Sequence, residues 1–403
     1  MRKNGNVCPG PGRARLSLGA LLLLAALALG AESGLTISPY LDYNYSSNVF
    51  WNVNQVADHA VSPGLDLDWR FDGLSFFLSA DGRFYNENAY LNSALAVGGF
   101  SWVKVLSSRT SLFVSPEFTL TRHDDTLSFL DTNVPGLSLG IKQVLSGRLF
   151  GRLGVSARYS DYTNEDSYDR ARLAAFVELS AFFPSQTTLR VTAGLNYLRR
   201  FPHVAVYPAP AGAPAGSSGN GLPNGRGGPS RPVTPADSGT TPSSVVLAIP
   251  QPYVIARVAQ GIGFTTGVYA EFMLRRNQDA LQGLQALAAS EWALEQTDDD
   301  FFWEGERLSV GLKTEAILGL EIAIDVSQVK KRYKGIEALD LDGLPIQPLA
   351  TREDTLSQAS LRLGKRLRRA ELSTAVTYRR NGSNDLYFQY DFLTISAGVQ
   401  FLL

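Results

Sequence analysis

Cysteine is almost missing from this sequence: Cys8 is the one cysteine among 403 residues. Cys8 lies before the apolar run Leu16–Leu29, whereas the lipid-bearing cysteine of a lipoprotein would follow such a run. If the chain is cut after that run, no cysteine remains. Disulfide frameworks and thiolate chemistry are then excluded.

Histidine and methionine are scarce too. The three histidines, His59, His123 and His203, are scattered without the spacing of metal ligands. Two methionines beside an aromatic content of 10% suit strands better than a helical core. The formal net charge of −1 gives no nucleic-acid footprint, and the glycine-rich stretches lack the strand–helix context of a nucleotide site. We therefore predict no metal, no cofactor and no nucleic-acid partner.

Long apolar runs are also absent after the first 30 residues, so no transmembrane helix is predicted there. Before that point, four basic residues and no acid precede the apolar run Leu16–Leu29. The small residues Ala28 and Gly30 lie two positions apart at the end of this run. This order is typical of a secretory signal peptide, which we assign to residues 1–30. An uncleaved signal anchor is the alternative.

What the sequence does have is alternation of apolar and polar residues. The last segment, "YDFLTISAGVQFLL", places apolar residues on one parity and Thr, Ser, Gly and Gln on the other. Such a period of two is typical of a β-strand with one apolar face. Because a strand edge open to lipid is very costly, this last strand should pair with the first and close the sheet. The residues expected to close it are Leu393, Ile395, Val399, Phe401 and Leu403.

The same alternation recurs along the chain in about sixteen segments, although 14 or 18 strands would also fit. The least regular are residues 93–105 and 245–258. Prolines in or near strands are the main objection, because proline removes a donor from the sheet ladder. We expect Pro63 at a rim and Pro116 at a bulge, and the others concerned are Pro39, Pro250 and Pro252.

The breaks between these segments alternate between short turns and long loops. This asymmetry is typical of outer-membrane barrels, which have short periplasmic turns and longer external loops. We predict an all-β fold for residues 31–403: a closed antiparallel transmembrane β-barrel. Residues 202–243 are rich in Pro, Gly and Ser and are expected to form a flexible external loop. A linker between two domains is the alternative reading of that stretch.

The polar parity carries charged side chains in mid-strand. A soluble barrel would turn its apolar face inward, whereas a membrane barrel turns that face to lipid and keeps charge in the lumen. The signal peptide, the loop asymmetry and the apolar last strand favour the membrane barrel. The predicted lumen-facing residues are Asp66, Asp68, Arg70, Asp81, Arg83, Glu117, Arg152, Arg158, Glu178, Arg190, Glu271, Glu321, Asp325 and Glu371.

The last strand resembles the C-terminal recognition strand of bacterial outer-membrane barrels, although such strands commonly end in Phe and here Phe401 is two residues from the end. The stretch "YNYSSNVFW", Tyr43–Trp51, resembles the start of porin-like barrels found with exopolysaccharide export systems. These resemblances imply a Gram-negative outer membrane as the location after signal-peptide cleavage. The implied partners are outer-membrane lipid and lipopolysaccharide, the barrel-assembly machinery and, for an export barrel, periplasmic export partners.

A barrel of this size leaves an aqueous lumen, which predicts a porin-like channel for passive passage of small solutes. The alternative is the barrel component of a polysaccharide or cell-surface export system. A barrel-borne enzyme would have to use His123 beside Asp124 and Asp125, but one adjacent pair sets no catalytic geometry. We therefore predict no enzyme activity and no catalytic residue. The basic run Val329–Lys334 could contact lipopolysaccharide phosphates, but we favour a solvated rim.

Overall fold

The computed structural model describes most of the chain after the leader. The described residues are 34–71, 73–164, 168–200, 248–277, 301–315, 319–341, 344–346 and 350–402. The expected signal peptide (1–30), the Pro/Gly/Ser-rich loop (202–243), His203 and Leu403 lie outside them.

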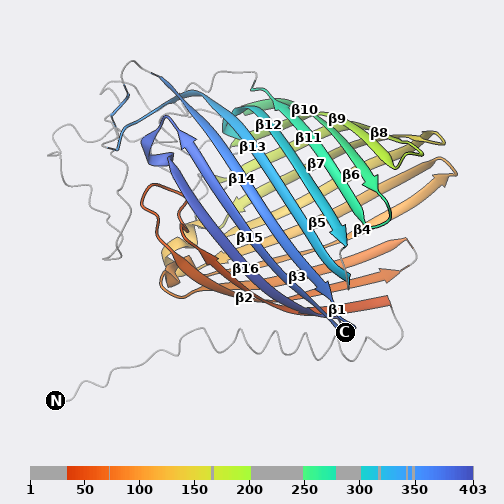
Figure 1. Ribbon diagram of the computed structural model, residues 1–403, viewed down its shortest axis with the longest axis horizontal. Coiled ribbons are helices and arrows are strands. Elements are labelled where there is room, and N and C mark those ends of the chain that lie inside the picture. Colours follow the sequence, from red (N-terminus) through yellow and green to blue (C-terminus); the bar gives the residue numbers. More distant parts are fainter. Residues whose placement is uncertain are drawn as a thin grey trace, which may run out of the picture.

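Sixteen strands are present among the described residues, and they form one closed antiparallel barrel in which each strand pairs with its neighbours in the sequence (Figure 1). The predicted fold class is confirmed. The irregular segments predicted at 93–105 and 245–258 correspond to two of these strands, β4 and β10. The strands are β1 (Gly34–Ser46), β2 (Asp58–Phe71), β3 (Leu74–Tyr85), β4 (Ser93–Ser107), β5 (Thr110–His123), β6 (Thr132–Ser146), β7 (Leu149–Tyr162), β8 (Arg170–Phe182), β9 (Thr187–Arg200), β10 (Ala248–Ile262), β11 (Thr266–Arg275), β12 (Glu304–Glu315), β13 (Leu320–Glu337), β14 (Thr351–Arg366), β15 (Ala370–Ser383) and β16 (Tyr390–Phe401).

The barrel closes through β1 and β16, as the apolar last strand predicted. Their register pairs Leu41 with Val399, Tyr43 with Ala397 and Tyr45 with Ile395. Each of these residues belongs to the apolar parity of its strand. The wall is therefore continuous, and neither end strand presents an open edge.

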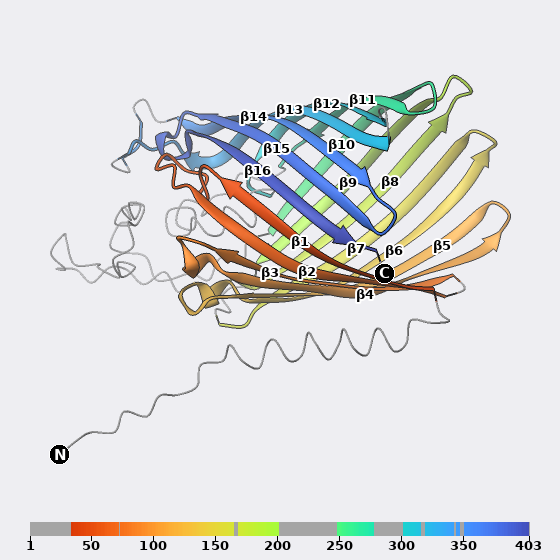
Figure 2. The same cartoon turned by 60° about the horizontal axis from the view of Figure 1, so that its bottom comes forward.

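The two ends of the barrel differ (Figure 2). The turns that follow the even-numbered strands up to β14 are short, and both β1 and β16 meet this turn end (Figure 1). The opposite loop end carries the longer connections. Short 3-10 helices lie in three of them: η1 (Ala89–Leu91), η2 (Asp125–Leu130) and η5 (Leu386–Phe388). No helix among the described residues is long and apolar enough to cross a membrane.

Three prolines interrupt the sheet without displacing it. The β2–β3, β4–β5 and β6–β7 ladders each skip two residue pairs, and the gaps contain Pro63, Pro116 and Pro135 respectively. The register is the same on both sides of each gap. Pro116 therefore lies at an interruption, not at the expected bulge, and Pro63 lies within β2, not at a rim. Because proline has no N–H to donate, losing ladder bonds locally accommodates it.

The remaining prolines lie where a ladder has not yet begun. The ladder between β1 and β16 begins at Tyr40, one residue after Pro39. The ladder between β10 and β11 begins at Tyr253, just after Pro250 and Pro252. Each of these prolines is therefore paired with a strand on one side only. Its missing N–H removes no hydrogen bond from a ladder on the other side.

Candidate functional site

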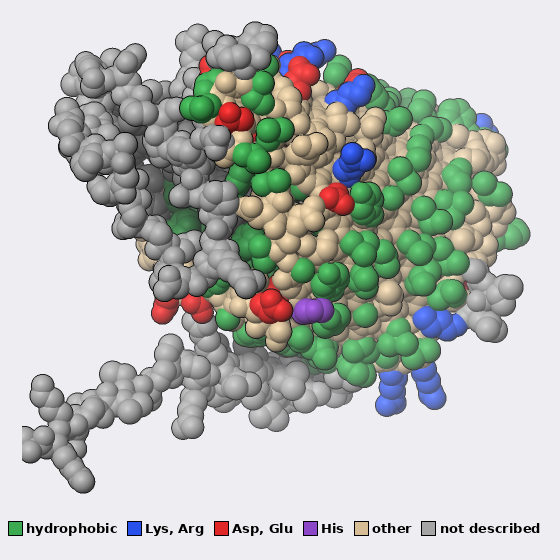
Figure 3. Space-filling model, turned by 60° about the vertical axis from the view of Figure 1, so that its left-hand side comes forward, with side chains coloured by type: hydrophobic (Ala, Val, Ile, Leu, Met, Phe, Trp, Pro, Cys, Tyr) green, Lys and Arg blue, Asp and Glu red, His purple; other side chains and the backbone are tan. Residues whose placement is uncertain are grey.

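The outer surface of the barrel is apolar. Side chains such as Leu153, Val177, Leu308 and Val310 are about half exposed, although each lies in the middle of a paired strand. In Figure 3 hydrophobic side chains spread over the wall, whereas charged side chains gather toward its two ends. A surface of this kind is suited to hydrocarbon.

Aromatic residues mark both borders of this surface. Near the turn end, Trp69 lies 5.6 Å from Phe76, which lies 5.9 Å from Phe100, measured between ring centroids. Near the loop end, outward aromatics recur on separate strands. They are Tyr43, Phe84, Phe118, Tyr159, Phe272 and Tyr378. Two aromatic girdles flanking an apolar band are typical of a transmembrane barrel.

The charged residues proposed for the lumen lie on the parity opposite to the exposed apolar side chains. On β2, for example, Trp69 and Phe71 are exposed on the outside, so Asp68 and Arg70 point inward. The same argument places the others inward on β3, β5, β7, β8, β9, β11, β13 and β15. Asp68 and Arg70 form an ion pair of 3.0 Å beside the turn end.

Glu117 and Arg158 are brought together although they are not on adjacent strands. Glu117 on β5 and Arg158 on β7 both stand opposite Gly136 of the intervening β6. The two side chains meet across it with an Oε1–Nη2 distance of 2.6 Å. A Cβ atom at Gly136 would lie 2.9 Å from Glu117 Cγ and 3.3 Å from Arg158 Cγ, so the glycine is what leaves room for the pair.

A second bridge of the same design spans β11, β12 and β13. The Tyr269 hydroxyl donates to Asp325 Oδ1 across Gly311, which is paired with both residues. A Cβ atom at Gly311 would come within 2.3 Å of the Tyr269 ring and 2.5 Å of Asp325 Oδ1. Inner-face glycines thus let polar groups reach second-neighbour strands.

Further ion pairs join adjacent strands. Glu271 on β11 lies 2.7 Å from Arg307 on β12 and 3.7 Å from Arg257 on β10. Elsewhere on the inner face, Arg190 and Glu178 are 3.9 Å apart, and Lys313 and Glu321 are 2.8 Å apart. The structure therefore brings most of the predicted acids into pairs with cations.

Two predicted acids lie in a different setting. Asp66 accepts hydrogen bonds from Ser79 at 2.7 Å and from Gln400 at 3.2 Å, and Asp81 shares its inner face on the next strand. Asp42 of β1, which the sequence analysis missed, also points inward beside them. The β1–β3 wall is thus acidic.

The wall from β7 to β12 carries arginines instead. The sequence analysis predicted three of them, Arg152, Arg158 and Arg190. The inward arginines that it missed on this arc are Arg170, Arg172, Arg200, Arg257, Arg275 and Arg307. Their parity could have identified all six, because each lies on the parity opposite to the exposed apolar residues of its strand. The two arcs give the bore one acidic side and one basic side.

An inward-folded segment narrows the loop end on the basic side. Phe301, Phe302 and Trp303, which precede β12, are buried against inner-face apolar residues of β9, β10, β11 and β13. The Arg275 guanidinium lies 4.2 Å from the centre of the Trp303 ring, and Gln251 Nε2 donates to the Trp303 carbonyl at 3.2 Å. The sequence analysis did not predict this segment, which lies just before the first residue of β12.

Glu304 secures the end of that segment. It is almost fully buried, and its carboxylate lies 2.8 Å from Lys334 Nζ. The next residue, Gly305, has φ +152°, and a Cβ there would lie 1.9 Å from the Lys330 carbonyl oxygen. The chain therefore turns from the bore into the wall at a position that needs glycine.

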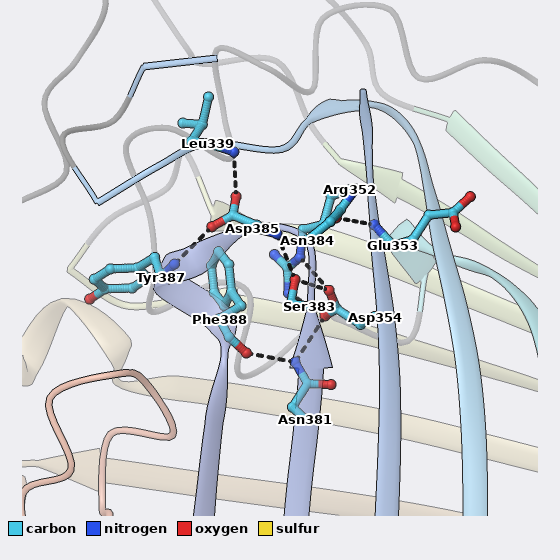
Figure 4. Close-up of polar contacts among 10 residues, drawn as sticks. All are labelled: Leu339, Arg352, Glu353, Asp354, Asn381, Ser383, Asn384, Asp385, Tyr387 and Phe388. Carbon is cyan, nitrogen blue, oxygen red and sulfur yellow. Dashed lines mark hydrogen bonds and ion pairs between the residues drawn. The ribbon is translucent and has the colours of Figure 1, made fainter. Parts of the chain in front are cut away.

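A polar network connects residues at the loop end of the barrel, beside β14, β15 and β16 (Figure 4). Asp354 accepts from Arg352 at 2.7 Å and from Ser383 at 2.6 Å. The Arg352 guanidinium lies 3.5 Å from the centre of the Phe388 ring in η5. Asp385 accepts from the backbone N–H groups of Leu339 and Tyr387, which ties the β13–β14 and β15–β16 loops together.

His123 faces a different acid from the one expected. Its Nδ1 lies 3.3 Å from Asp131, which also accepts from the His123 backbone N–H at 2.6 Å. Ser93 stands opposite His123 in the β4–β5 register, but no hydrogen bond joins the two among the described residues. The described residues contain no group of three or more His, Cys, Asp or Glu side chains placed to hold a metal ion.

The basic run Val329–Lys334 does not form one patch. It lies in β13, so its side chains alternate between the faces of the wall. Lys330 lies 3.3 Å from Glu306, and Arg332 lies 2.9 Å from Glu353. Lys334 is paired with buried Glu304. The charge of these three residues is compensated locally, as at a solvated rim.

The comparisons with known proteins include distant barrels of solved structure. No family model and no curated protein matches the sequence. Among solved structures, the chain is similar to the outer membrane protein opdK from Pseudomonas aeruginosa, with 11% identity over 92% of this chain and 98% of that one and a TM-score of 0.46. It is also similar to Pseudomonas aeruginosa OccK2 (OpdF) in complex with glucuronate (9%, 92% and 98%, TM-score 0.48) and to Acinetobacter baumannii OccAB1 (10%, 93% and 99%, TM-score 0.46). At such distances the likeness adds no argument, and the fold rests on this chain's own strand pairing.

Proposed function

We propose that this protein is an outer-membrane channel through which small polar solutes diffuse passively. The observation that carries the proposal is the division of the wall: apolar and girdled by aromatics outside, charged and ion-paired inside. Charged side chains on an inner face need water, and a sixteen-stranded barrel is wide enough to hold an aqueous bore. No step of this function calls for catalysis.

The bore also supports selection among solutes. Its acidic β1–β3 side and arginine-bearing β7–β12 side orient a dipolar solute as it passes. The buried segment Phe301–Trp303 reduces the open cross-section on the basic side, near the loop end. The segment therefore lies on the side of the bore that carries inward arginines such as Arg257 and Arg307.

Recording from planar lipid bilayers tests the proposal. The purified barrel, shown to be folded by its heat-dependent shift on a gel, is expected to give stepwise conductance in KCl. A folded barrel that inserts into the bilayer and never conducts would reject the channel function.

The second candidate is the barrel component of a polysaccharide or cell-surface export system. One observation favours it: the segment Tyr43–Trp51, which carries the resemblance to export barrels, ends at the mouth, where Trp51 stacks on Phe392 at 5.7 Å. Deletion of the gene separates the candidates. Loss of surface glycan with unchanged uptake of small solutes would favour export over diffusion.

A further inference from the structure

Two hollows adjoin on the outer wall near the loop end of β12–β16. A groove of about 360 Å³ crosses from β12 to β15, where small Ser357 and Ala359 lie between Leu308 and Tyr378. A pocket of about 410 Å³ lies beside it, between residues 53–55 and the start of β16. The Tyr378 side chain belongs to the lining of both, so the two hollows share a wall.

The hollows lie where the outer surface changes from apolar to polar. One cross-strand row of outward side chains is apolar, and it consists of Val326, Ala359, Tyr378 and Leu393. The adjacent row toward the loop end is polar, and it consists of Gln328, Ser357, Arg380 and Asp391. The groove is lined from both rows, and the pocket lies mainly along the polar one. A ligand that fills both must be apolar at one end and polar at the other.

The pocket is lined by one cation, Arg380, and one acid, Asp391. Arg380 is exposed and makes no ion pair or hydrogen bond with any described residue. The neighbouring outward cations differ, because Lys330 and Arg332 are paired with Glu306 and Glu353. Asp391, which stands opposite Arg380, accepts a hydrogen bond from Gln55 Nε2 at 3.0 Å. The guanidinium therefore remains available to an anionic group at the border of the apolar surface.

We propose that these hollows form a binding site for one phosphate-bearing lipid of the outer leaflet. An acyl chain lies in the groove over Ser357 and Ala359, and the phosphate lies against Arg380 in the pocket. Arginine suits this role because its planar fork of donors matches phosphate oxygens. Basic sites beside membrane-spanning segments recognise lipid headgroups in the same way. The proposal needs the barrel to lie in a membrane, but it does not need the barrel to conduct.

Native mass spectrometry of the detergent-purified full-length protein tests the site, with lipid A as the probe. Dephosphorylated lipid A and phosphatidylglycerol form the comparison arms, because they separate the contribution of the phosphate from that of the lipid class. We expect Arg380→Gln to weaken lipid A binding about tenfold, the loss typical of one charge-assisted hydrogen bond. The matched control is Arg332→Gln, which removes an outward charge already neutralised by Glu353 and should leave binding unchanged. Ala359→Leu, which fills the groove, should weaken both lipid A and phosphatidylglycerol.

Each other outcome counts against the site. Equal loss in Arg380→Gln and Arg332→Gln would show a general charge effect. Dephosphorylated lipid A that binds as tightly as lipid A would remove the role of the phosphate. If Ala359→Leu alters the oligomeric state and not lipid binding, the groove holds a second copy of the chain. Conductance recorded on the same preparations keeps a failure here distinct from a failure of the channel function.

Discussion

Glu117 and Arg158 form a 2.6 Å ion pair across a whole intervening strand, because the residue between them is Gly136. Both side chains point into the bore. The pair neutralises an arginine that would otherwise present a net charge to passing solutes.

Replacing Glu117 with Gln should make the channel more selective for anions. The substitution keeps the size of the side chain but leaves the Arg158 charge without its carboxylate. The reversal potential in a KCl gradient across a planar bilayer should move toward the chloride equilibrium value. Glu353→Gln is the control, because it removes a carboxylate of similar pairing from the outer surface; a shift of equal size in that variant would contradict the assignment of Glu117 to the bore.

Gly311→Ala should destabilise the barrel by about 1–3 kcal/mol, because the added methyl overlaps the Tyr269 ring and the Asp325 carboxylate. Gly364→Ala is the matched control, since its Cβ would meet only Glu321 Cβ at an ordinary 3.6 Å. The temperature at which the folded gel band is lost measures both. Equal temperatures for the two variants would show that the Tyr269–Asp325 bridge tolerates a side chain between its partners.

Trp303→Ala should increase single-channel conductance. Trp303 is buried under the Arg275 guanidinium on the inner wall, and its removal detaches the segment that narrows the bore. Trp102→Ala, which removes an outward aromatic near the turn end, should leave conductance at the wild-type value. An unchanged conductance in Trp303→Ala would mean that this segment does not limit the flow of ions.

Two adjacent residues of β12 should differ in how well they tolerate arginine. Val310 is exposed on the outer wall, so Val310→Arg should cost about 2–4 kcal/mol of stability in lipid. Ser309 points inward and is paired in register with Glu271 and Ser327, so Ser309→Arg should fold normally. The yield of folded protein in the outer membrane compares the two. A soluble barrel with its apolar face inside would reverse the order.

Alternation of residue type was enough to predict the barrel and its closure. The last strand, which contains Val399 and Phe401, was predicted to pair with the first strand. Without that partner its backbone edge would be open to lipid, which is very costly. Most inward charges followed from the same parity. The signal is strong because a shift of one residue would turn every side chain of a strand to the wrong face.

The pairing register between neighbouring strands could not be predicted from the sequence. Nothing near Gly136 or Gly311 indicates which residues stand opposite on the flanking strands, so the bridges across them could not be anticipated. The turn of Phe301–Trp303 into the bore depends on inner-face apolar residues from four separate strands. The basic run Val329–Lys334 was expected to form a solvated rim, and its Lys330, Arg332 and Lys334 are paired with acids. Arg380 differs from these three, because it makes no ion pair with any described residue.

The proline gaps distribute the ladder hydrogen bonds unevenly around the wall. All three lie between β2 and β7, whereas the ladders from β7 through β12 run without interruption. Because the arc from β2 to β7 lacks backbone pairs that the other arc keeps, we expect local opening of the sheet to begin beside these prolines.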